Sequence, residues 1–175
     1  MPPTPFPSAS AAVVRYHREG GAAAASRLDR SLRNSSYWGP GGTPQNRGWA
    51  DAIRGCFDVY RRLADWDNRP SFTEGLRSDL LLPPDELGTY IDVLLFDGSG
   101  YVPRVVLWDT NEPTDDRVVM YAAPAWKVAE NELGDGRIPE VEVWHLRSSR
   151  QFTIQAADAD AALPEVGRVV HRLAS

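Results

Sequence analysis

The chain contains very few of the residues on which several common chemistries depend. Among its 175 residues Cys56 is the only cysteine, which excludes an intrachain disulfide and a cysteine-based zinc site and fits a reducing compartment. Lys127 is the only lysine, so a mechanism that needs a lysine has one candidate. No segment approaches the roughly 18 apolar residues of a membrane span, and the N-terminus MPPTPFPSAS lacks the basic and apolar parts of a secretory signal. We therefore expect a soluble, cytoplasmic protein with no membrane partner.

The chain is mildly acidic, with 24 acidic and 19 basic residues and a formal net charge of −5. Nucleic-acid-binding domains usually carry a basic excess, so the composition does not support a broad nucleic-acid-binding face. All but one of the basic residues are arginines. A GC-rich coding sequence is the simplest reason for this bias, and local clustering of the guanidinium groups for anion binding is the functional alternative.

The first part of the chain differs in composition from the rest. Residues 1–42 are rich in proline, glycine and alanine and have little periodic hydrophobicity, which is typical of a flexible arm. The alternative is an arm that becomes ordered on a partner, with Tyr37 and Trp38 as the contact residues. Residues 43–175, by contrast, predict a single α/β domain with its own core.

The second part opens with a helical pattern. Thr43 and Pro44 suit the N-cap and the first turn of a helix. Apolar residues then recur at helical spacing, at Trp49, Ala52, Ile53, Cys56, Phe57, Tyr60, Leu63 and Ala64. Residues 67–88 come next and read mostly as loop, with at most one short element around the Pro-Pro pair.

Two hairpins follow. The first pairs Ile91–Phe96 with Val102–Trp108 around the turn DGSG, and the second pairs Val141–Leu146 with Gln151–Ile154 around RSSR. The chain ends in a helix whose apolar residues are Leu163, Val166, Val169, Val170 and Leu173. These elements predict an α/β fold with a mixed sheet, packed against two or three helices.

Residues 115–134, between the hairpins, allow two interpretations. They form either one helix interrupted by Pro124, or a strand over 117–122 followed by a helix whose first residue is Pro124. The valines and the tyrosine of RVVMYA have high strand propensity, so we predict the second arrangement.

Two aspartates lie in the apolar strands of the first hairpin, at Asp92 and Asp109. Carboxylates on adjacent strands can bind Mg²⁺, which would activate water and stabilise a phosphoryl transition state. The two side chains share a face only if the turn has an even number of residues or a strand contains a bulge. The simpler interpretation is that both are polar residues at strand ends, with Asp109 starting the turn TNEPTDD.

The stretch IDVLLFDGSGYVPRVVLWDTN resembles the PD-(D/E)XK nuclease superfamily. That superfamily has a carboxylate early in one strand, a glycine-containing turn, and an apolar strand that ends in Asp/Glu-x-Lys. Downstream, IPEVEVWHL is similar to the Val-Pro-Glu-Tyr-Trp stretch of a family of restriction-endonuclease-like proteins. The resemblance covers about residues 85–175 and implies a restriction-endonuclease-like core.

The resemblance also implies site residues. Asp92 and Asp109 match the two acids that bind Mg²⁺. Asn111 falls where the family has its catalytic lysine, so the site resembles a degenerate one in which Asn111 orients water. Arg117 and Tyr121 resemble a Gln-x-x-x-Tyr phosphate-binding motif, provided that this segment is helical. The implied partner is DNA.

Two functional hypotheses follow. The first is Mg²⁺-dependent hydrolysis of DNA, or a degenerate, non-cleaving version of it. The second is a non-catalytic adaptor module that docks on a protein partner or a second copy through residues 1–42 and an open sheet edge. The enzyme needs both aspartates on one face of an accessible cleft with arginines around it, whereas the module needs an exposed apolar patch.

Overall fold

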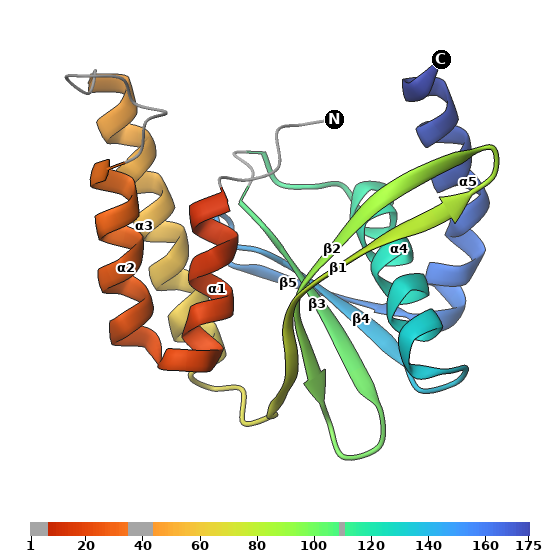
Figure 1. Ribbon diagram of the computed structural model, residues 1–175, viewed down its shortest axis with the longest axis horizontal. Coiled ribbons are helices and arrows are strands. Elements are labelled where there is room, and N and C mark those ends of the chain that lie inside the picture. Colours follow the sequence, from red (N-terminus) through yellow and green to blue (C-terminus); the bar gives the residue numbers. More distant parts are fainter. Residues whose placement is uncertain (1–6, 35–43, 109–110) are drawn as a thin grey trace.

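Helices enclose a central β-sheet on both sides in the computed structural model of the chain, which describes residues 7–34, 44–108 and 111–175 (Figure 1). In chain order the described elements are α1 (Pro7–Glu19), α2 (Gly21–Asn34), α3 (Pro44–Ala64), β1 (Ser71–Leu82), β2 (Asp85–Phe96), β3 (Tyr101–Leu107), α4 (Asp115–Leu133), β4 (Glu140–His145), β5 (Arg150–Gln155) and α5 (Ala156–Ala174). The mixed α/β architecture with flanking helices is confirmed.

Hairpins and one crossover build the sheet, whose strand order is β1-β2-β3-β4-β5. The pairs β1–β2, β2–β3 and β4–β5 are antiparallel, whereas β3 and β4 are parallel. Parallel neighbours need a crossover connection, which α4 supplies. The two predicted hairpins, β2–β3 and β4–β5, are therefore confirmed.

Each face of the sheet has its own apolar core. Helices α1, α2 and α3 cover one face, called the N-terminal face below, and α4 and α5 cover the other (Figure 1). On the N-terminal face Val93 and Trp144 pack with Tyr60 of α3. On the opposite face Ile91 packs with small residues of α4 such as Ala122. The candidate site described below lies on the N-terminal face.

The N-terminal residues differ from the expected flexible or partner-ordered arm. Over residues 7–34 the chain forms α1 and α2, whose apolar positions are buried in the core of the N-terminal face: Ala9, Ala12, Val13, Ala24, Leu28 and Leu32. Alanines let helices approach closely, so an apolar stripe that looks thin in sequence still packs well. The predicted boundary at 42 and 43 and the predicted contact residues Tyr37 and Trp38 lie outside the described residues.

The prediction of a loop over residues 67–88 is wrong. Strands β1 and β2 form a long hairpin in which Leu82 pairs with Asp85 across a tip made of Pro83 and Pro84. At the tip no ladder hydrogen bond is required, so the two prolines do not interrupt the strands. Leu80 on this hairpin is buried against the core of α4 and α5, and that burial stabilises the strands.

Strand β2 turns over at Asp92. Ile91 and Val93 pack into different cores on opposite faces of the sheet, although residues two apart in a strand normally share a face. The register places Gly75 of β1 opposite Asp92, and Gly75 has a φ of +68°. A positive φ is accessible to glycine without steric cost, so Gly75 permits the change of face. Because of this rotation, Asp92 does not follow the regular alternation of faces along β2.

The predicted strand over residues 117–122 is also wrong. Helix α4 runs without interruption from Asp115 to Leu133 and contains Pro124 in its interior. Its Val118 and Ala122 are fully buried, so packing of the apolar helical face outweighs the strand propensity of the valines. Proline in a helix removes one backbone hydrogen bond, a cost that the buried alanines around Pro124 offset by close packing on the sheet.

Candidate functional site

Asp92 lies where β2 separates from β3. The ladder between these strands ends at the pair Val93 and Arg104. Beyond it the Asp92 carboxylate replaces the missing strand contact, because Oδ2 accepts a hydrogen bond from the backbone N–H of Val106 at 2.8 Å. The residue is only 2% exposed, and its Oδ1 has no hydrogen-bond partner among the described residues. The carboxylate therefore already has a structural role.

Burial also changes the protonation of Asp92. Loss of solvation raises its pKa to about 7, and the Val106 N–H and the charge of Arg104 lower it only in part. A carboxylate binds a metal in its deprotonated form. At neutral pH and with no ion bound, the Asp92 side chain is thus both enclosed and partly protonated.

The turn between β2 and β3 bears on whether the second acid of the predicted metal site can meet Asp92. The first hairpin has a two-residue turn, Gly98 and Ser99, between Asp97 and Gly100, whose backbone groups hydrogen bond at 3.2 Å. The turn has an even number of residues, but the alternation of faces breaks at Asp92, beyond the last β2–β3 pair, so the turn alone does not decide which face Asp92 shares. Asp109 lies outside the described residues, so its meeting with Asp92 stays a prediction. Among the described residues, no group of three or more His, Cys, Asp or Glu is arranged to hold a metal.

The other residues implied by the resemblance lie after β3. Asn111 is exposed, with no fixed role in the core. Arg117 and Tyr121 stand one turn apart near the start of α4, and Nη2 of Arg117 donates to the Tyr121 hydroxyl at 3.3 Å. This segment is helical, as the Gln-x-x-x-Tyr resemblance requires, and its phosphate-binding role stays a prediction.

A closed ring of four charged side chains lies on the N-terminal face. This ionic ring consists of Asp67, Arg69, Glu142 and Arg104. Nη2 of Arg69 contacts Asp67 at 2.8 Å and Glu142 at 2.6 Å, and Nη2 of Arg104 contacts Glu142 at 2.7 Å. An ion pair between Arg104 and Asp67 closes the ring. Two positive and two negative charges therefore cancel within it.

Three parts of the fold bring the ionic ring together. Arg104 and Glu142 are direct neighbours in the parallel register of β3 and β4. The loop after α3 adds Asp67 and Arg69, and it is tightened because Asp67 accepts a bond from the Arg69 backbone N–H at 3.1 Å. The Arg104 side chain is fully buried, with its guanidinium 3.5 Å from the ring centre of Trp144. A buried charge is tolerated only with such partners.

The pKa values of two ring members, Asp67 and Arg69, reflect their pairing. Burial by itself would raise the pKa of Asp67, but hydrogen bonds from Arg69 and Arg104 hold that pKa well below its usual range. The bond to Asp67 in turn raises the pKa of Arg69. The ring is therefore a set of ion pairs that favours the ionised form of Asp67.

A polar contact beneath α1 adjoins the ionic ring. Nε2 of His17 and the hydroxyl of Tyr60 hydrogen bond at 2.6 Å. Burial, reinforced by the charge of Arg104, lowers the pKa of His17 to about 4, and burial raises the pKa of Tyr60 above its usual range. Both side chains are thus neutral at pH 7, and together they join α1 to α3.

A hollow of about 400 Å³ opens beside the ionic ring. We call it the Trp66 hollow. It is lined by Leu63 of α3, by Trp66 just after that helix, by Trp144 and Gln151 of the sheet, and by three ring residues, Asp67, Arg69 and Glu142. Trp66 is 87% exposed, although tryptophan is normally well buried. Since the ring carboxylates are already paired, the hollow offers a rigid floor and an exposed indole, without a free catalytic group.

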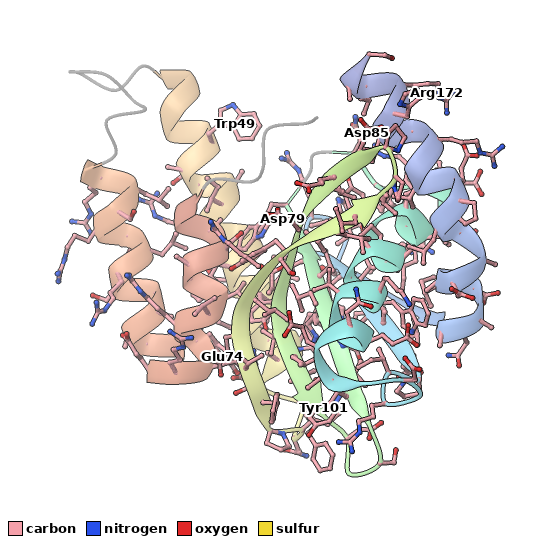
Figure 2. All side chains as sticks on the ribbon, turned by 45° about the vertical axis from the view of Figure 1, so that its right-hand side comes forward. Trp49, Glu74, Asp79, Asp85, Tyr101 and Arg172 are labelled. Carbon is pink, nitrogen blue, oxygen red and sulfur yellow. The ribbon has the colours of Figure 1, made fainter. Side chains whose placement is uncertain are left out.

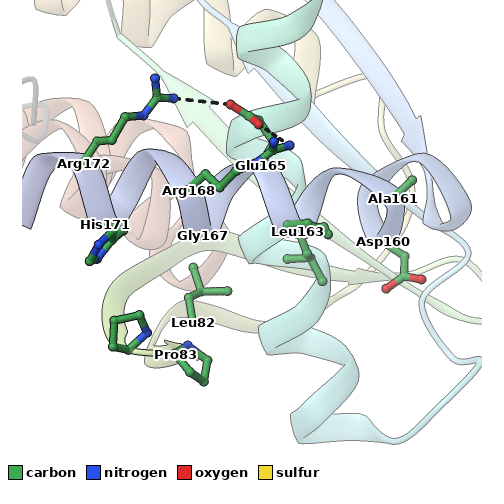
Figure 3. A pocket seen from close by; sticks show the side chains of 12 residues that line it. Leu82, Pro83, Asp160, Ala161, Leu163, Glu165, Gly167, Arg168, His171 and Arg172 are labelled. Atoms are coloured by element: carbon green, nitrogen blue, oxygen red, sulfur yellow. Dashed lines mark hydrogen bonds and ion pairs between the residues drawn. The ribbon is translucent and has the colours of Figure 1, made fainter.

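A second groove, of about 1100 Å³, lies between the β1–β2 tip and α5 (Figure 3). Its floor is apolar, with Leu82 and Leu163 facing it and His171 hydrogen-bonded to Asp85 at 2.9 Å. The arginines along α5, Arg168 and Arg172, both pair with Glu165 on its outer side (Figure 3). This groove contains no constellation of catalytic side chains.

Sequence reasoning missed the ionic ring, although a signal was present. Arg104 and Glu142 are charged residues inside the apolar runs VPRVVLW and VEVWHL. Charges in such positions must be paired, so each predicts a partner of opposite sign. Asp67 and Arg69 fall within residues 67–88, for which the sequence predicts mostly loop. Their distance along the chain from the other two residues conceals the association.

Comparison with known proteins gives no family for this chain. No protein-family model matches it, and a search of curated proteins finds no match. None of the helices that the structure describes is long and apolar enough to cross a bilayer. Function must therefore be argued from the geometry of Asp92, the ionic ring and the Trp66 hollow.

Proposed function

We propose that this protein acts by binding and not by catalysis, as a protein-interaction module built on a degenerate, nuclease-like scaffold. The observation that carries this proposal is the state of Asp92. A catalytic metal ligand has to be accessible and ionised. Asp92 is only 2% exposed, its carboxylate accepts a hydrogen bond from the backbone N–H of Val106, and its pKa is about 7.

The nuclease-like scaffold is itself part of the proposal. A helix precedes the β2–β3 hairpin, α4 follows it as a crossover, and β4 lies parallel to β3, in the order that the sequence resemblance implies. Asn111 occupies the position of the family's lysine and is exposed. A scaffold that keeps this layout while its first acid supports the sheet suits a protein that no longer cleaves its ligand.

The Trp66 hollow is the surface that we assign to a protein partner. Exposed tryptophans next to a pocket are typical centres of protein interfaces, because they bury a large area with little loss of conformational entropy. The floor of the hollow is fixed by the ionic ring, so a partner side chain would meet a preformed surface. An apolar or aromatic side chain packed between Trp66 and Leu63 fits this lining.

The absence of catalysis is tested by titrating Mg²⁺ and Mn²⁺ into the wild type and an Asp92→Asn/Asp109→Asn variant by calorimetry. The same proteins are incubated with single- and double-stranded DNA. We expect no heat that depends on the two aspartates and no cleavage. Cleavage by the wild type that is lost in the variant would overturn the proposal and restore the Mg²⁺-dependent nuclease.

The partner surface is tested by placing a photoreactive amino acid at Gln151, which lines the Trp66 hollow, in cells of the source organism. We expect one protein to cross-link there and the adduct to disappear with Trp66→Ala. The matched control is the same label at Leu173, which is 70% exposed. An adduct that survives Trp66→Ala, or one that forms equally at Leu173, would refute the assignment.

A further inference from the structure

Positive and negative charge are unequally divided along this chain. Residues 1–64 contain nine arginines and four acidic residues, a net charge of +5. Residues 65–175 contain ten basic and twenty acidic residues, a net charge of −10. The net charge of −5 for the whole chain therefore conceals a basic helical layer, formed by α1, α2 and α3, on an acidic remainder. Because of this division, polyanions are attracted to the basic helical layer and repelled by the acidic remainder.

The basic charge is most concentrated on α2. The buried positions of this helix, Ala24, Leu28 and Leu32, lie on one side, in the core of the N-terminal face. Arg27, Arg30 and Arg33 are exposed on the opposite side, three residues apart. Figure 2 shows nitrogen-tipped side chains reaching outward from the helices that lie on the far side from α5. We call Arg27, Arg30 and Arg33 the α2 arginine row.

The acidic residues nearest the α2 arginine row are already paired. Asp29, the only acid of α2, accepts a bond from Nε of Arg54 at 2.6 Å. Glu19 contacts Arg27 at 3.0 Å in an exposed pair, which contributes little and is easily exchanged for another anion. Among the described residues no ion pair engages Arg30 or Arg33. The row therefore presents guanidinium groups that can bind an external anion.

We propose that the α2 arginine row binds the phosphate backbone of a nucleic acid, without sequence preference. This surface is separate from the Trp66 hollow and extends the proposed function. Successive arginines rise by about 4.5 Å along the helix, so the row spans about 9 Å. One DNA strand carries a phosphate about every 3.4 Å of its axis, so the row covers about three phosphates. The small neighbours Ala23 and Ser26 leave room for the backbone to approach.

Other anionic partners fit this surface less well. A helix that lies on a membrane needs an exposed apolar face, whereas the apolar face of α2 is buried in the protein. Protein interfaces centre on aromatic or aliphatic anchors, whereas the side chains described as exposed on α2 are those of arginine, serine and alanine. Guanidinium groups bind phosphate and carboxylate alike in a bidentate manner, so the preference for a nucleic acid rests on the lack of an apolar anchor among the exposed residues described on α2.

The experiment measures fluorescence anisotropy of labelled duplex and single-stranded DNA, each about 20 nucleotides long, with the full chain. With three phosphate contacts, log K for duplex DNA falls against log salt with a slope of about −2.7, or about 40-fold between 50 and 200 mM. For Arg30→Glu/Arg33→Glu we expect at least a tenfold loss of affinity and a slope near −1. The matched control, Arg168→Glu/Arg172→Glu on α5, changes the net charge equally and should bind as the wild type does.

Four results would overturn the proposal. Equal loss of binding in both double variants would show that only net charge matters. Binding of poly-glutamate with the same affinity and salt slope would assign the row to acidic proteins, and binding of phosphatidylserine vesicles but not DNA would assign it to a membrane. The milder Arg30→Ala/Arg33→Ala variant, with its fold checked by circular dichroism, should show the same direction of change. Wild-type affinity in that folded variant would equally refute the assignment.

Discussion

Replacing Asp92 by asparagine should stabilise the protein at neutral pH and leave it nearly unchanged in acid. The asparagine side chain is neutral and its oxygen can accept the same bond from the Val106 N–H. It therefore imitates the protonated form of Asp92 that burial favours. The variant removes the cost of ionising a carboxyl group that is 2% exposed and keeps the strand contact.

The magnitude follows from the pKa of Asp92, which burial raises from 3.8 to about 7. A group whose pKa is higher in the folded state binds more protons when folded, so its contribution to stability falls as pH rises between these values. Each unit corresponds to about 1.4 kcal/mol, so ionisation costs the wild type about 4 kcal/mol by pH 8. Asp92→Asn should thus gain about 4 kcal/mol relative to the wild type between pH 4 and pH 8.

His17 has the opposite effect in almost the same interval. Its pKa is lowered to about 4, so the folded state binds fewer protons than the unfolded state and stability falls as pH drops below about 6.5. In the wild type the two contributions partly cancel. His17→Gln should therefore reveal the falling stability caused by Asp92 more steeply than the wild type does.

Urea denaturation followed by circular dichroism at several pH values between 4 and 8 measures these differences. All other titrating groups are shared, so the difference between wild type and Asp92→Asn isolates Asp92. A difference that does not change with pH would mean that Asp92 ionises normally in the folded protein. That result would refute our view of its burial and make Asp92 available as a metal ligand again.

Three further variants test the packing. Arg104→Met leaves Asp67 and Glu142 without a buried partner and should cost about 3–5 kcal/mol, seen as a large fall in Tm; a loss below 1 kcal/mol would mean that the ionic ring is weakly coupled. Gly75→Ala should cost about 1–2 kcal/mol, because alanine disfavours a φ of +68° and its Cβ would lie 3.1 Å from Val14; unchanged urea stability would argue against the change of face at Asp92. Trp66→Ala should change the unfolding free energy by less than about 0.5 kcal/mol, because Trp66 is 87% exposed; a larger loss would show that the indole supports the fold.

The local periodicity of the sequence determined a large part of the fold. The apolar face of α3, the two hairpins β2–β3 and β4–β5, and the final helix were all predictable from the spacing of apolar residues. Spacing reports which side chains avoid water in a regular element. It is therefore informative for amphipathic helices and for strands that have turn residues at their ends.

Tertiary structure decided the elements whose local signals were ambiguous. Helices α1 and α2 rely on buried alanines, α4 places strand-forming valines in a helix, and the long β1–β2 hairpin depends on packing against α4 and α5. In each case, the stabilisation comes from contacts with residues far away in the chain. Intrinsic propensities differ by only about 1 kcal/mol, so such contacts can reverse them.

The same reasoning applies to the candidate site. The sequence showed that Asp92 is a carboxylate within an apolar strand, but only the fold showed that it replaces a strand contact where β2 separates from β3. The ionic ring joins Asp67 and Arg69 to two residues of the sheet, Arg104 and Glu142. Sequence determines the charge of a side chain. Its partner, and therefore its pKa and role, is fixed by which distant segments the packed core brings within hydrogen-bond distance.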